Sequence, residues 1–473
     1  MNLLQEHSGL YTDHYQLTMA QAHVLHNRHN VQASFDYFYR KNPFNGAYVI
    51  FAGLSDIVDF IENLRFSDED CHYLQSIGFD EKFTRYLRGF SFKGNIYAPK
   101  EGEVVFPVEP LIRVEGTLVE AQLIETALLN IVNFTSLIAT KAHRIRMIAG
   151  DRFLVDFGLR RAQAHGSILA SKAAIIGGFD GTSNVFSAHA YGLRSLGTLS
   201  HSWIQSFDNE LSSFRAFAEV YPDGCYLLVD TYDTLKTGVP NAITIAHELE
   251  AKGKRLQGIR LDSGDLAYLS KKARKMLDEA GLHYVKISCS NQLDEFVIRS
   301  LLEQGAPIDL FGVGTRLVTG QEDAVLDGVY KLSSSDGKPR LKISENVEKM
   351  ILPGDKNVLR FYDSDGMFYA DGVVLEEEEG IDTIFHPYHP DKHSSVKGYR
   401  SERLLNKVME NGKRLFPFPT PQQSAKYVKI STSKLYPEHK RLEFPHIYKV
   451  GISRKLQDLR SSLVSNIRSS IRS

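Results

Sequence analysis

The hydrophobic pattern of the first 150 residues mixes helical and strand-like spacing. Residues 1–30 predict a short helix whose apolar face includes Leu10, Leu17 and Val24. Residues 33–52 predict two strands joined by the turn NPFNG, because Asn, Pro and Gly favour turn geometry. Residues 95–119 predict short strands interrupted by proline, and residues 120–150 predict a helix that stops near a glycine. The N-terminal part is therefore expected to be mixed α and β.

After residue 151 short apolar runs recur, and several of the gaps between them contain a helical pattern such as LAYLSKKARKMLDEAG. This alternation is typical of βα units. Runs that are apolar throughout indicate strands covered on both faces. A parallel α/β barrel fits best, although a doubly wound sheet has the same signature. The runs are FLVDFG (153–158), GTLSHS (197–202), YLLVDT (226–231), GIRLDSGD (258–265), VKISCSN (285–291) and LFGVGT (310–315).

In both architectures the ligand site lies beyond the carboxyl ends of the strands. Those ends carry polar residues, namely Asp156, His201, Asp230, Asp262, Ser290 and Thr315. After residue 330 the pattern is β-like again, and it includes the segment PRLKISENVEKMIL. The last 25 residues place Lys and Arg on a helical pattern, which predicts a surface helix with Leu456, Leu459, Leu463 and Ile467 on one face.

Composition narrows the classes of protein. The net charge of the 473 residues is −1, whereas a nucleic-acid binder usually carries a basic excess. Cys71, Cys225 and Cys289 form no CxxC pair, which argues against a disulfide framework or zinc finger and fits a reducing compartment. We find neither a secretory signal nor an apolar stretch as long as a membrane span. The expected protein is soluble and cytoplasmic, and binds neither nucleic acid nor membrane.

Two glycine-bearing segments are candidates for phosphate binding. Residues 158–184 combine Arg160 and Arg161 with Gly-Gly and Gly-Thr-Ser-Asn, and arginines and open backbone N–H groups bind anions. The segment GVGTR (312–316) follows an apolar run, as a phosphate loop does. It does not match GxxxxGK[ST], the P-loop pattern. Both segments could instead be a plain turn and helix start.

Two further motifs carry reactive side chains. In IRLDSGD (259–265) Arg260 and Asp262 follow a strand, where an aspartate can bind ribose hydroxyls or the water shell of Mg²⁺, or merely cap the next helix. His201 lies in GTLSHSW, and a lone histidine is more often structural than catalytic. The cluster HPYHPDKH (386–393) lacks cysteines and is broken by prolines, so we do not expect a zinc site there.

Taken together and in order, these segments resemble the nicotinate phosphoribosyltransferase family over most of the chain. The matching motifs are YTDHYQLTMAQ (11–21), FPVEPLIRVEG (106–116), DFGLRRAQ (156–163), GGFDGTSNV (177–185), GTLSHSW (197–203), LLVDTYDTLKTGV (227–239), GIRLDSGDL (258–266), GVGTRLVT (312–319), LDGVYKL (326–332) and PEHKRL (437–442).

The resemblance implies a fold and a reaction. The fold is an irregular parallel α/β barrel with a second, mixed α+β domain formed by the two ends of the chain. The implied segments are an N-terminal domain (1–130), the barrel (131–345) and a C-terminal segment (346–473) that packs back on the N-terminal domain. The implied reaction joins nicotinate to phosphoribosyl pyrophosphate with ATP and Mg²⁺, in NAD salvage. The implied assembly is a homodimer with shared active sites.

The resemblance also implies roles for particular residues. His201 matches the histidine that becomes phosphorylated, Thr198 a nicotinate contact, and Asp262 the aspartate that binds ribose. Tyr15 and Phe157 match the two rings that sandwich the pyridine. The remaining matches are Arg160 and Arg260 near the pyridine and phosphoribosyl groups, Gly314 and Thr315 in the phosphate loop, and Arg161 and Asp13 as site residues of less defined role.

Three alternatives stay open at this point. Nicotinamide phosphoribosyltransferases have GTD where this chain has GTS, and Ser183 can donate a hydrogen bond to a carboxylate that an aspartate would repel. Quinolinate phosphoribosyltransferases need no ATP, and the GTLSHSW motif argues against them. A non-catalytic nucleotide-binding homologue is the third, although no expected site residue is missing. One departure is His14, where the family often has leucine.

Overall fold

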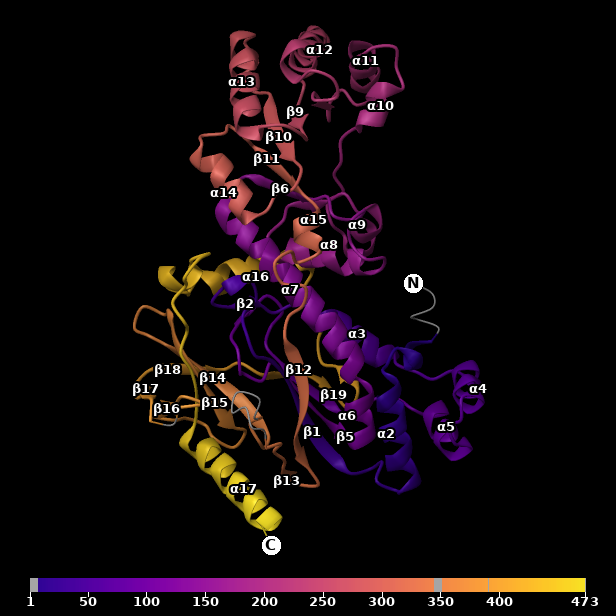
Figure 1. The fold of residues 1–473 in the computed structure, drawn as a ribbon, viewed down its shortest axis with the longest axis vertical. Coiled ribbons are helices and arrows are strands. Elements are labelled where there is room, and N and C mark those ends of the chain that lie inside the picture. Colours follow the sequence, from indigo (N-terminus) through magenta and orange to yellow (C-terminus); the bar gives the residue numbers. More distant parts are fainter. Residues whose placement is uncertain (1–6, 344–350, 390, 473) are drawn as a thin grey trace. The chain divides into compact units, whose positions relative to one another are not determined.

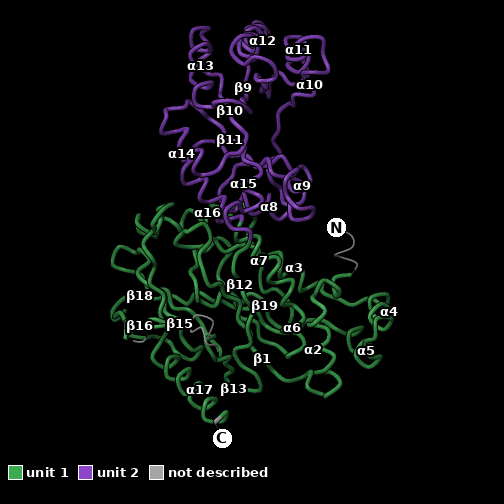
Figure 2. The backbone as a smooth tube through the Cα atoms, in the orientation of Figure 1, with its two compact units in different colours: residues 1–137, 325–473 green, residues 138–324 purple. Residues whose placement is uncertain are grey.

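A computed structural model describes residues 7–343, 351–389 and 391–472 of the chain (Figure 1). They form two compact units, coloured separately in Figure 2. Unit 1 combines residues 1–137 with residues 325–473, and unit 2 consists of residues 138–324. Part of the segment PRLKISENVEKMIL, which the sequence predicts to be β-like, lies outside the described residues, as does one residue of HPYHPDKH.

Unit 2 contains a six-stranded parallel sheet in the order β7-β6-β11-β10-β9-β8. The first strand, β6, pairs with the last, β11, so the strand order is that of a cycle opened only between β7 and β8. A doubly wound sheet would keep these strands apart, and the prediction of an irregular parallel barrel is confirmed. The strands are β6 (Phe153–Asp156), β7 (Gly181–Thr182), β8 (Tyr226–Leu228), β9 (Gly258–Leu261), β10 (Lys286–Ser290) and β11 (Leu310–Val313).

Helices follow most of these strands, as βα units require. Apolar strand residues are fully buried, as expected for a sheet covered on both faces, and examples are Ile259, Leu261, Ile287, Phe311 and Val313. The helices are α7 (Glu125–Ala149, which begins in unit 1), α8 (Gly166–Ile176), α9 (Val185–Tyr191), α10 (His201–Gln205), α11 (Glu210–Val220), the π-helix η3 (Thr234–Gly238), α12 (Val239–Ala251), α13 (Leu266–Glu279), α14 (Glu295–Glu303) and α15 (Thr315–Val318).

The run GTLSHS (197–202) is not a strand, contrary to the prediction. Ser195 makes one isolated parallel bridge with Thr182, residues 196–200 are coil, and His201 begins α10. The segment is mostly glycine and hydroxyl residues, which lack the apolar side chains that bury a central strand. It runs where the sheet is open, beside β7.

Unit 1 is built mainly on two sheets, one of seven strands and one of six. Sheet A has the order β13-β12-β1-β5-β3-β19-β20 and is antiparallel, and sheet D has the order β17-β16-β21-β15-β14-β18. Sheet A comprises β1 (Gln32–Tyr39), β3 (Asn95–Ala98), β5 (Ile112–Thr117), β12 (Gly328–Ser335), β13 (Lys338–Pro339), β19 (Asn406–Glu410) and β20 (Lys413–Arg414). Sheet D comprises β14 (Lys356–Tyr362), β15 (Phe368–Leu375), β16 (Thr383–Phe385), β17 (His393–Ser395), β18 (Arg400–Arg403) and β21 (Val450–Ile452). Within sheet A, strands from the N-terminal part of the chain therefore pair with strands from the C-terminal part.

The helices of unit 1 come mainly from the N-terminal part. They are α2 (His14–Leu25), α3 (Leu54–Asn63), α4 (Asp68–Ser76), α5 (Glu81–Arg88), α6 (Leu118–Leu123), α16 (Pro421–Ser433) and α17 (Arg454–Arg472), with short 3₁₀ turns η1 (Ser8–Leu10), η2 (Pro43–Asn45) and η5 (Pro437–Lys440). The predicted C-terminal helix is confirmed as α17, although its Leu456 is fully buried.

The two strands predicted within residues 33–52 exist, but they belong to different sheets. β1 pairs with β5 and β12, whereas β2 (Val49–Ile50) pairs with β4 (Val104–Val105). Between them Phe44 has a φ of 57° and is 3% exposed. Burial of this ring holds the strained turn in the core and redirects the chain to the second sheet.

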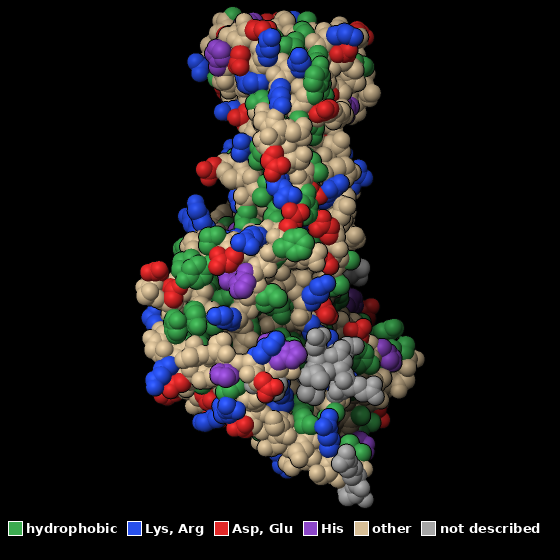
Figure 3. Space-filling view, turned by 60° about the vertical axis from the view of Figure 1, so that its left-hand side comes forward, with side chains coloured by type: hydrophobic (Ala, Val, Ile, Leu, Met, Phe, Trp, Pro, Cys, Tyr) green, Lys and Arg blue, Asp and Glu red, His purple; other side chains and the backbone are tan. Residues whose placement is uncertain are grey.

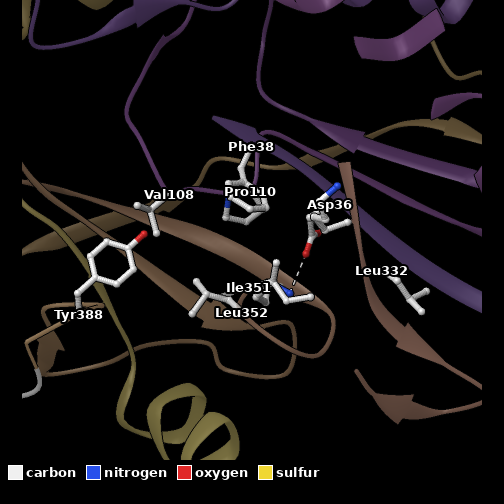
Figure 4. A pocket seen from close by; sticks show the side chains of 10 residues that line it. Asp36, Phe38, Val108, Pro110, Leu332, Ile351, Leu352 and Tyr388 are labelled. Atoms are coloured by element: carbon white, nitrogen blue, oxygen red, sulfur yellow. Dashed lines mark ion pairs between the residues drawn. The ribbon is translucent and has the colours of Figure 1, made fainter. Parts of the chain in front are cut away.

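Unit 1 also buries charged side chains. Lys356 Nζ lies 2.7 Å from Asp36 Oδ2 (the dashed line in Figure 4). The pocket around this pair, lined by Phe38, Val108 and Pro110 among others, holds about 20 Å³ and therefore at most a single water molecule. It is a packing defect beside an ion pair and too small for a substrate.

The surface carries both signs of charge. Basic and acidic side chains are interspersed over the face shown in Figure 3. Within the described ranges, no helix combines the length and the apolar character that a membrane crossing requires.

Candidate active site

A cleft of about 860 Å³ lies in unit 2 at the carboxyl ends of the barrel strands. It is lined by residues that follow β6, β7, β9, β10 and β11, and by the coil before α10. Ten residues that the sequence singled out are among its lining: Phe157, Arg160, Arg161, Ser183, Thr198, Arg260, Asp262, Ser290, Gly314 and Thr315. The parallel sheet brings them together because all its strands end at one edge.

Arg260 on β9 links polar side chains of the cleft to one another through hydrogen bonds. Its Nε donates to Ser290 Oγ, its Nη1 to Thr198 Oγ1 and its Nη2 to Asp262 Oδ1, each at 2.9 Å. Ser290 Oγ in turn donates to Asp262 Oδ1. The guanidinium carbon lies 5.4 Å from the centre of the Phe157 ring. A cation, a carboxylate and an aromatic face are thus held in one rigid group.

A buried aspartate orients the Ser183 loop. Asp156, at the end of β6, is fully buried and accepts hydrogen bonds from Ser171 Oγ, Thr182 Oγ1 and Gly158 N, each at 2.8 Å. Its backbone carbonyl accepts from Ser183 N at 2.8 Å. Burial raises the pKa of Asp156, and these three hydrogen bonds oppose the rise. Asp156 therefore supports the cleft from behind and leaves Ser183 at its surface.

His201 stands beside this group at the first position of α10. Its Nδ1 lies 3.0 Å from Thr231 Oγ1, and its Nε2 lies 3.9 Å from Asp262 Oδ2. The His201 side chain is 40% exposed, so the ring remains open to a reactant. Asp230, after β8, accepts from Asp262 N and from Ser263 Oγ, both at 2.7 Å. Asp262 is thereby fixed through its backbone as well as its side chain.

The loop after β11 is anchored from outside the cleft. Thr315 begins α15, and the next residue, Arg316, pairs with Asp294. Asp294 caps α14 through Phe296 N and Val297 N, at 3.0 and 2.8 Å. Glycine is required at 312, because a Cβ there would lie 2.3 Å from the Phe157 ring. The backbone of Gly314 and Thr315 is therefore presented to the cleft in a fixed form.

Several lining residues were not anticipated from the sequence. Asn291 and Gln292, after β10, have φ values of 91° and 48°, which non-glycine residues rarely adopt. Strain of this kind concentrates at ligand sites. An aromatic wall of Trp203, Phe217 and Tyr221 also lines the cleft. The position of Asn291 after a strand was a usable signal, whereas the aromatic spacing on α11 looked like ordinary core packing.

Comparison with known proteins identifies the family. Models of the nicotinate phosphoribosyltransferase N-terminal domain, the family itself and its C-terminal domain match residues 10–133, 153–363 and 355–460. The chain is 43% identical over 476 residues to nicotinate phosphoribosyltransferase of Bacillus subtilis, covering 98% of this chain and 96% of that protein. The chain belongs to the nicotinate phosphoribosyltransferase family. The Mycobacterium tuberculosis relative is 41% identical over 96% of this chain and 93% of its own.

Solved structures agree with this membership. The crystal structure of human nicotinic acid phosphoribosyltransferase matches with a TM-score of 0.86 and 32% identity, over 96% of this chain and 99% of that one. A structure titled nicotinate-nucleotide pyrophosphorylase from Pyrococcus furiosus matches with a TM-score of 0.72 and 24% identity, over 92% and 96% of the two chains. The second match shows the fold alone.

Two residues that family resemblance placed in the site lie in unit 1. Asp13 precedes α2, where its Oδ2 accepts from Thr126 Oγ1 at 2.8 Å. Tyr15 is 49% exposed, and neither residue lines the cleft of unit 2. Between them, the ring of His14 lies 5.4 Å from that of Phe79. The opening motif of the family is thus on a separate unit from the other candidate residues.

Proposed function

We propose that this chain transfers the phosphoribosyl group of phosphoribosyl pyrophosphate to nicotinate, which yields nicotinate mononucleotide and pyrophosphate for NAD salvage. The observation that carries the proposal is the rigid group of Arg260, Asp262 and Ser290 facing Phe157, with His201 at its edge. It offers an aromatic face to the pyridine ring, a cation to the phosphoribosyl group and a carboxylate to ribose hydroxyls.

The chemistry requires the departing anion to be stabilised. Displacement at the anomeric carbon passes through an oxocarbenium-like centre while pyrophosphate leaves with its electron pair. Arg160 and Arg161 are exposed on the cleft and form no ion pair within the described part of the chain. The loop at Gly314 and Thr315 adds backbone N–H groups for a phosphate. These groups suit a polyanionic leaving group.

Ser183 favours nicotinate over nicotinamide. This residue lines the cleft, and the backbone carbonyl of Asp156 holds its N–H at 2.8 Å. A hydroxyl can donate a hydrogen bond to the carboxylate of nicotinate, whereas an aspartate there would repel it. The base is therefore selected by charge at this position.

ATP and Mg²⁺ complete the proposal. The exposed imidazole of His201, held at Thr231, is the group that accepts the γ-phosphoryl of ATP, and loss of that phosphate couples ATP hydrolysis to product formation. Asp262 and Asp230 would offer carboxylate oxygens as ligands where Mg²⁺ accompanies pyrophosphate, and this hard cation prefers oxygen ligands. Bound Mg²⁺ would neutralise charge on the leaving group.

We also propose that the chain forms a homodimer and acts in the cytoplasm. Tyr15 is half-exposed on unit 1, so it can supply the second aromatic face to the cleft of another subunit in a homodimer. The three cysteines are buried and free, which fits a reducing cytoplasm. Sedimentation of the pure chain, with and without substrates, tests the dimer.

A product assay tests the reaction. Phosphoribosyl pyrophosphate and Mg²⁺ are supplied with equal nicotinate and nicotinamide, with and without ATP. We expect nicotinate mononucleotide whose yield rises with ATP, and we expect His201→Ala to lose that rise. Amide product would move the chain to the nicotinamide branch. No product from folded protein would favour a non-catalytic nucleotide-binding homologue.

A further inference from the structure

A second large cavity lies wholly within unit 1. Its volume is about 800 Å³, close to that of the cleft in unit 2, and small-molecule sites span about 300–1,000 Å³. The walls come from residues 98–101 after β3, from β14 and β18 of sheet D, and from α16 with the segment before it. None of these residues takes part in the proposed reaction.

The carboxylates of this cavity are already satisfied by protein donors. Glu103 accepts from Arg360 Nη1 at 2.9 Å and from Tyr427 Oη. Glu101 accepts from Gly53 N at 2.8 Å. Glu402 accepts from Tyr362 Oη at 3.0 Å. The acidic groups therefore have little attraction left for a cationic ligand.

Two lysines on the wall are in the opposite situation. Lys100 Nζ lies 5.5 Å from the centre of the Tyr427 ring, and Lys434 Nζ lies 5.2 Å from that of Tyr362. Across the described ranges, neither lysine pairs with a carboxylate at ion-pair distance. The other cations of the cavity are engaged, since Arg360 pairs with Glu103 and Asp371 and Arg403 pairs with Glu376. Two ammonium groups thus remain for an anion.

The rest of the lining is apolar and aromatic. Phe416 is 45% exposed, and its ring meets that of Phe418 edge to face at 6.0 Å. Leu404 and Val408 are buried beside them.

We propose that this cavity is a second ligand site and that it binds a small aromatic anion. The aromatic body packs against Phe416 and the two tyrosines, and Lys100 and Lys434 hold the anionic group. An aromatic carboxylate and a mononucleotide share this chemistry. The site is independent of the proposed transferase reaction because none of its residues lines the cleft of unit 2 or has a part in that reaction.

Calorimetric titration of the full chain with 2-naphthoate and with AMP tests the site. The test variant is Lys100→Gln with Lys434→Gln, which removes both charges but keeps the side-chain stems. The matched control is Lys252→Gln with Lys271→Gln, two exposed lysines of unit 2. We expect the test variant to weaken one binding site per chain by about tenfold for each ammonium group removed, and the control to match wild type.

The outcomes separate the ligand classes. If the test variant weakens binding of 2-naphthoate alone, the cavity is an aromatic carboxylate site; if it weakens binding of AMP alone, the cavity is a nucleotide site; if it weakens both, the shared chemistry is supported. Binding that the variant leaves unchanged belongs to the cleft of unit 2, which contains neither lysine. Equal affinity and stoichiometry in wild type and the test variant would overturn the proposal, as would no binding by either probe. If the double variant melts early, Lys100→Gln alone retains the test, since Lys100 is exposed. Product formation without probes should be unchanged, which separates this proposal from the transferase.

Discussion

Arg360 of unit 1 and the arginines that line the cleft of unit 2 are in opposite situations. In unit 1, Arg360 is 1% exposed and is neutralised by Glu103 at 2.9 Å and by Asp371 at 2.7 Å. In unit 2, Arg160 and Arg161 are exposed on the cleft, and Arg260 keeps one face toward the Phe157 ring. A buried ion pair must be closed to offset its desolvation, whereas a charge that binds substrate must stay available. Burial and ion pairing thus separate Arg360, which holds unit 1 together, from Arg160 and Arg161, which remain available to an anion.

Removing Arg260 should have the largest effect on the reaction. In Arg260→Met the cation and its hydrogen bonds to Ser290, Thr198 and Asp262 are lost, so kcat/KM for nicotinate mononucleotide should fall by about 10³-fold. Steady-state assays measure this. Arg255→Met, at an exposed arginine of the same unit, is the control and should stay near wild type. Equal activity of the two variants would contradict the assigned role.

Removing Arg360 should instead act on stability. Arg360→Met leaves two buried carboxylates uncompensated, which costs about 3–5 kcal/mol of unfolding free energy. Urea unfolding followed by circular dichroism reports both units, while the fluorescence of Trp203, the single tryptophan, follows unit 2. In this variant, the dichroism signal should begin to fall at a lower urea concentration than the fluorescence signal. Arg215→Met, at a partly exposed pair with Glu248, is the control. A similar loss of stability there would mean that burial of the Arg360 pair is not the cause.

A change at Ser183 should alter the choice of base. Ser183→Asp places a negative charge against the carboxylate of nicotinate, so kcat/KM for nicotinate should fall by about 10²-fold relative to nicotinamide. Ser183→Ala removes only a hydrogen bond and should cost about tenfold at most. Competition assays with both bases measure the ratio. An unchanged ratio in Ser183→Asp would remove Ser183 from the specificity argument.

The smallest expected effect is a pH dependence in unit 1. Burial, and then the neighbouring Asp371, raise the pKa of Glu109 well above its ordinary value of 4.5. The folded chain therefore keeps a proton that the unfolded chain releases, so wild-type stability falls as pH rises above 4.5 toward the folded pKa. Glu109→Gln keeps the size of the side chain but cannot ionise.

Urea unfolding at pH 5 and pH 8 checks this sign. The stability of Glu109→Gln relative to wild type should be greater at pH 8 than at pH 5, because only the wild type loses the stability linked to the Glu109 proton as pH rises. Groups common to both proteins cancel in the difference. A relative stability that is constant or falls with pH would show that Glu109 is ionised in the folded chain.

Much of the fold was accessible from local pattern. The alternation of apolar runs and helical segments after residue 151 predicts parallel strands, and their shared edge brings Arg260, Asp262, Ser290 and Thr315 together. The family motifs in the sequence also predicted the reaction. The pattern could not separate a barrel from a doubly wound sheet, because that depends on whether β6 meets β11, a contact between distant segments.

The sequence by itself determined the strand period, the polar residues at strand ends and the membership of the family, since these depend on neighbouring residues along the chain. Tertiary structure alone decided which strand-end aspartate supports the cleft from behind and which one lies within it. Asp156 and Asp262 look alike in sequence, yet Asp156 is fully buried behind the cleft while the Asp262 side chain is 30% exposed within it. It also decided that Lys100 and Lys434 share a cavity. Burial and charge pairing depend on segments far apart in sequence, and local patterns do not encode those contacts.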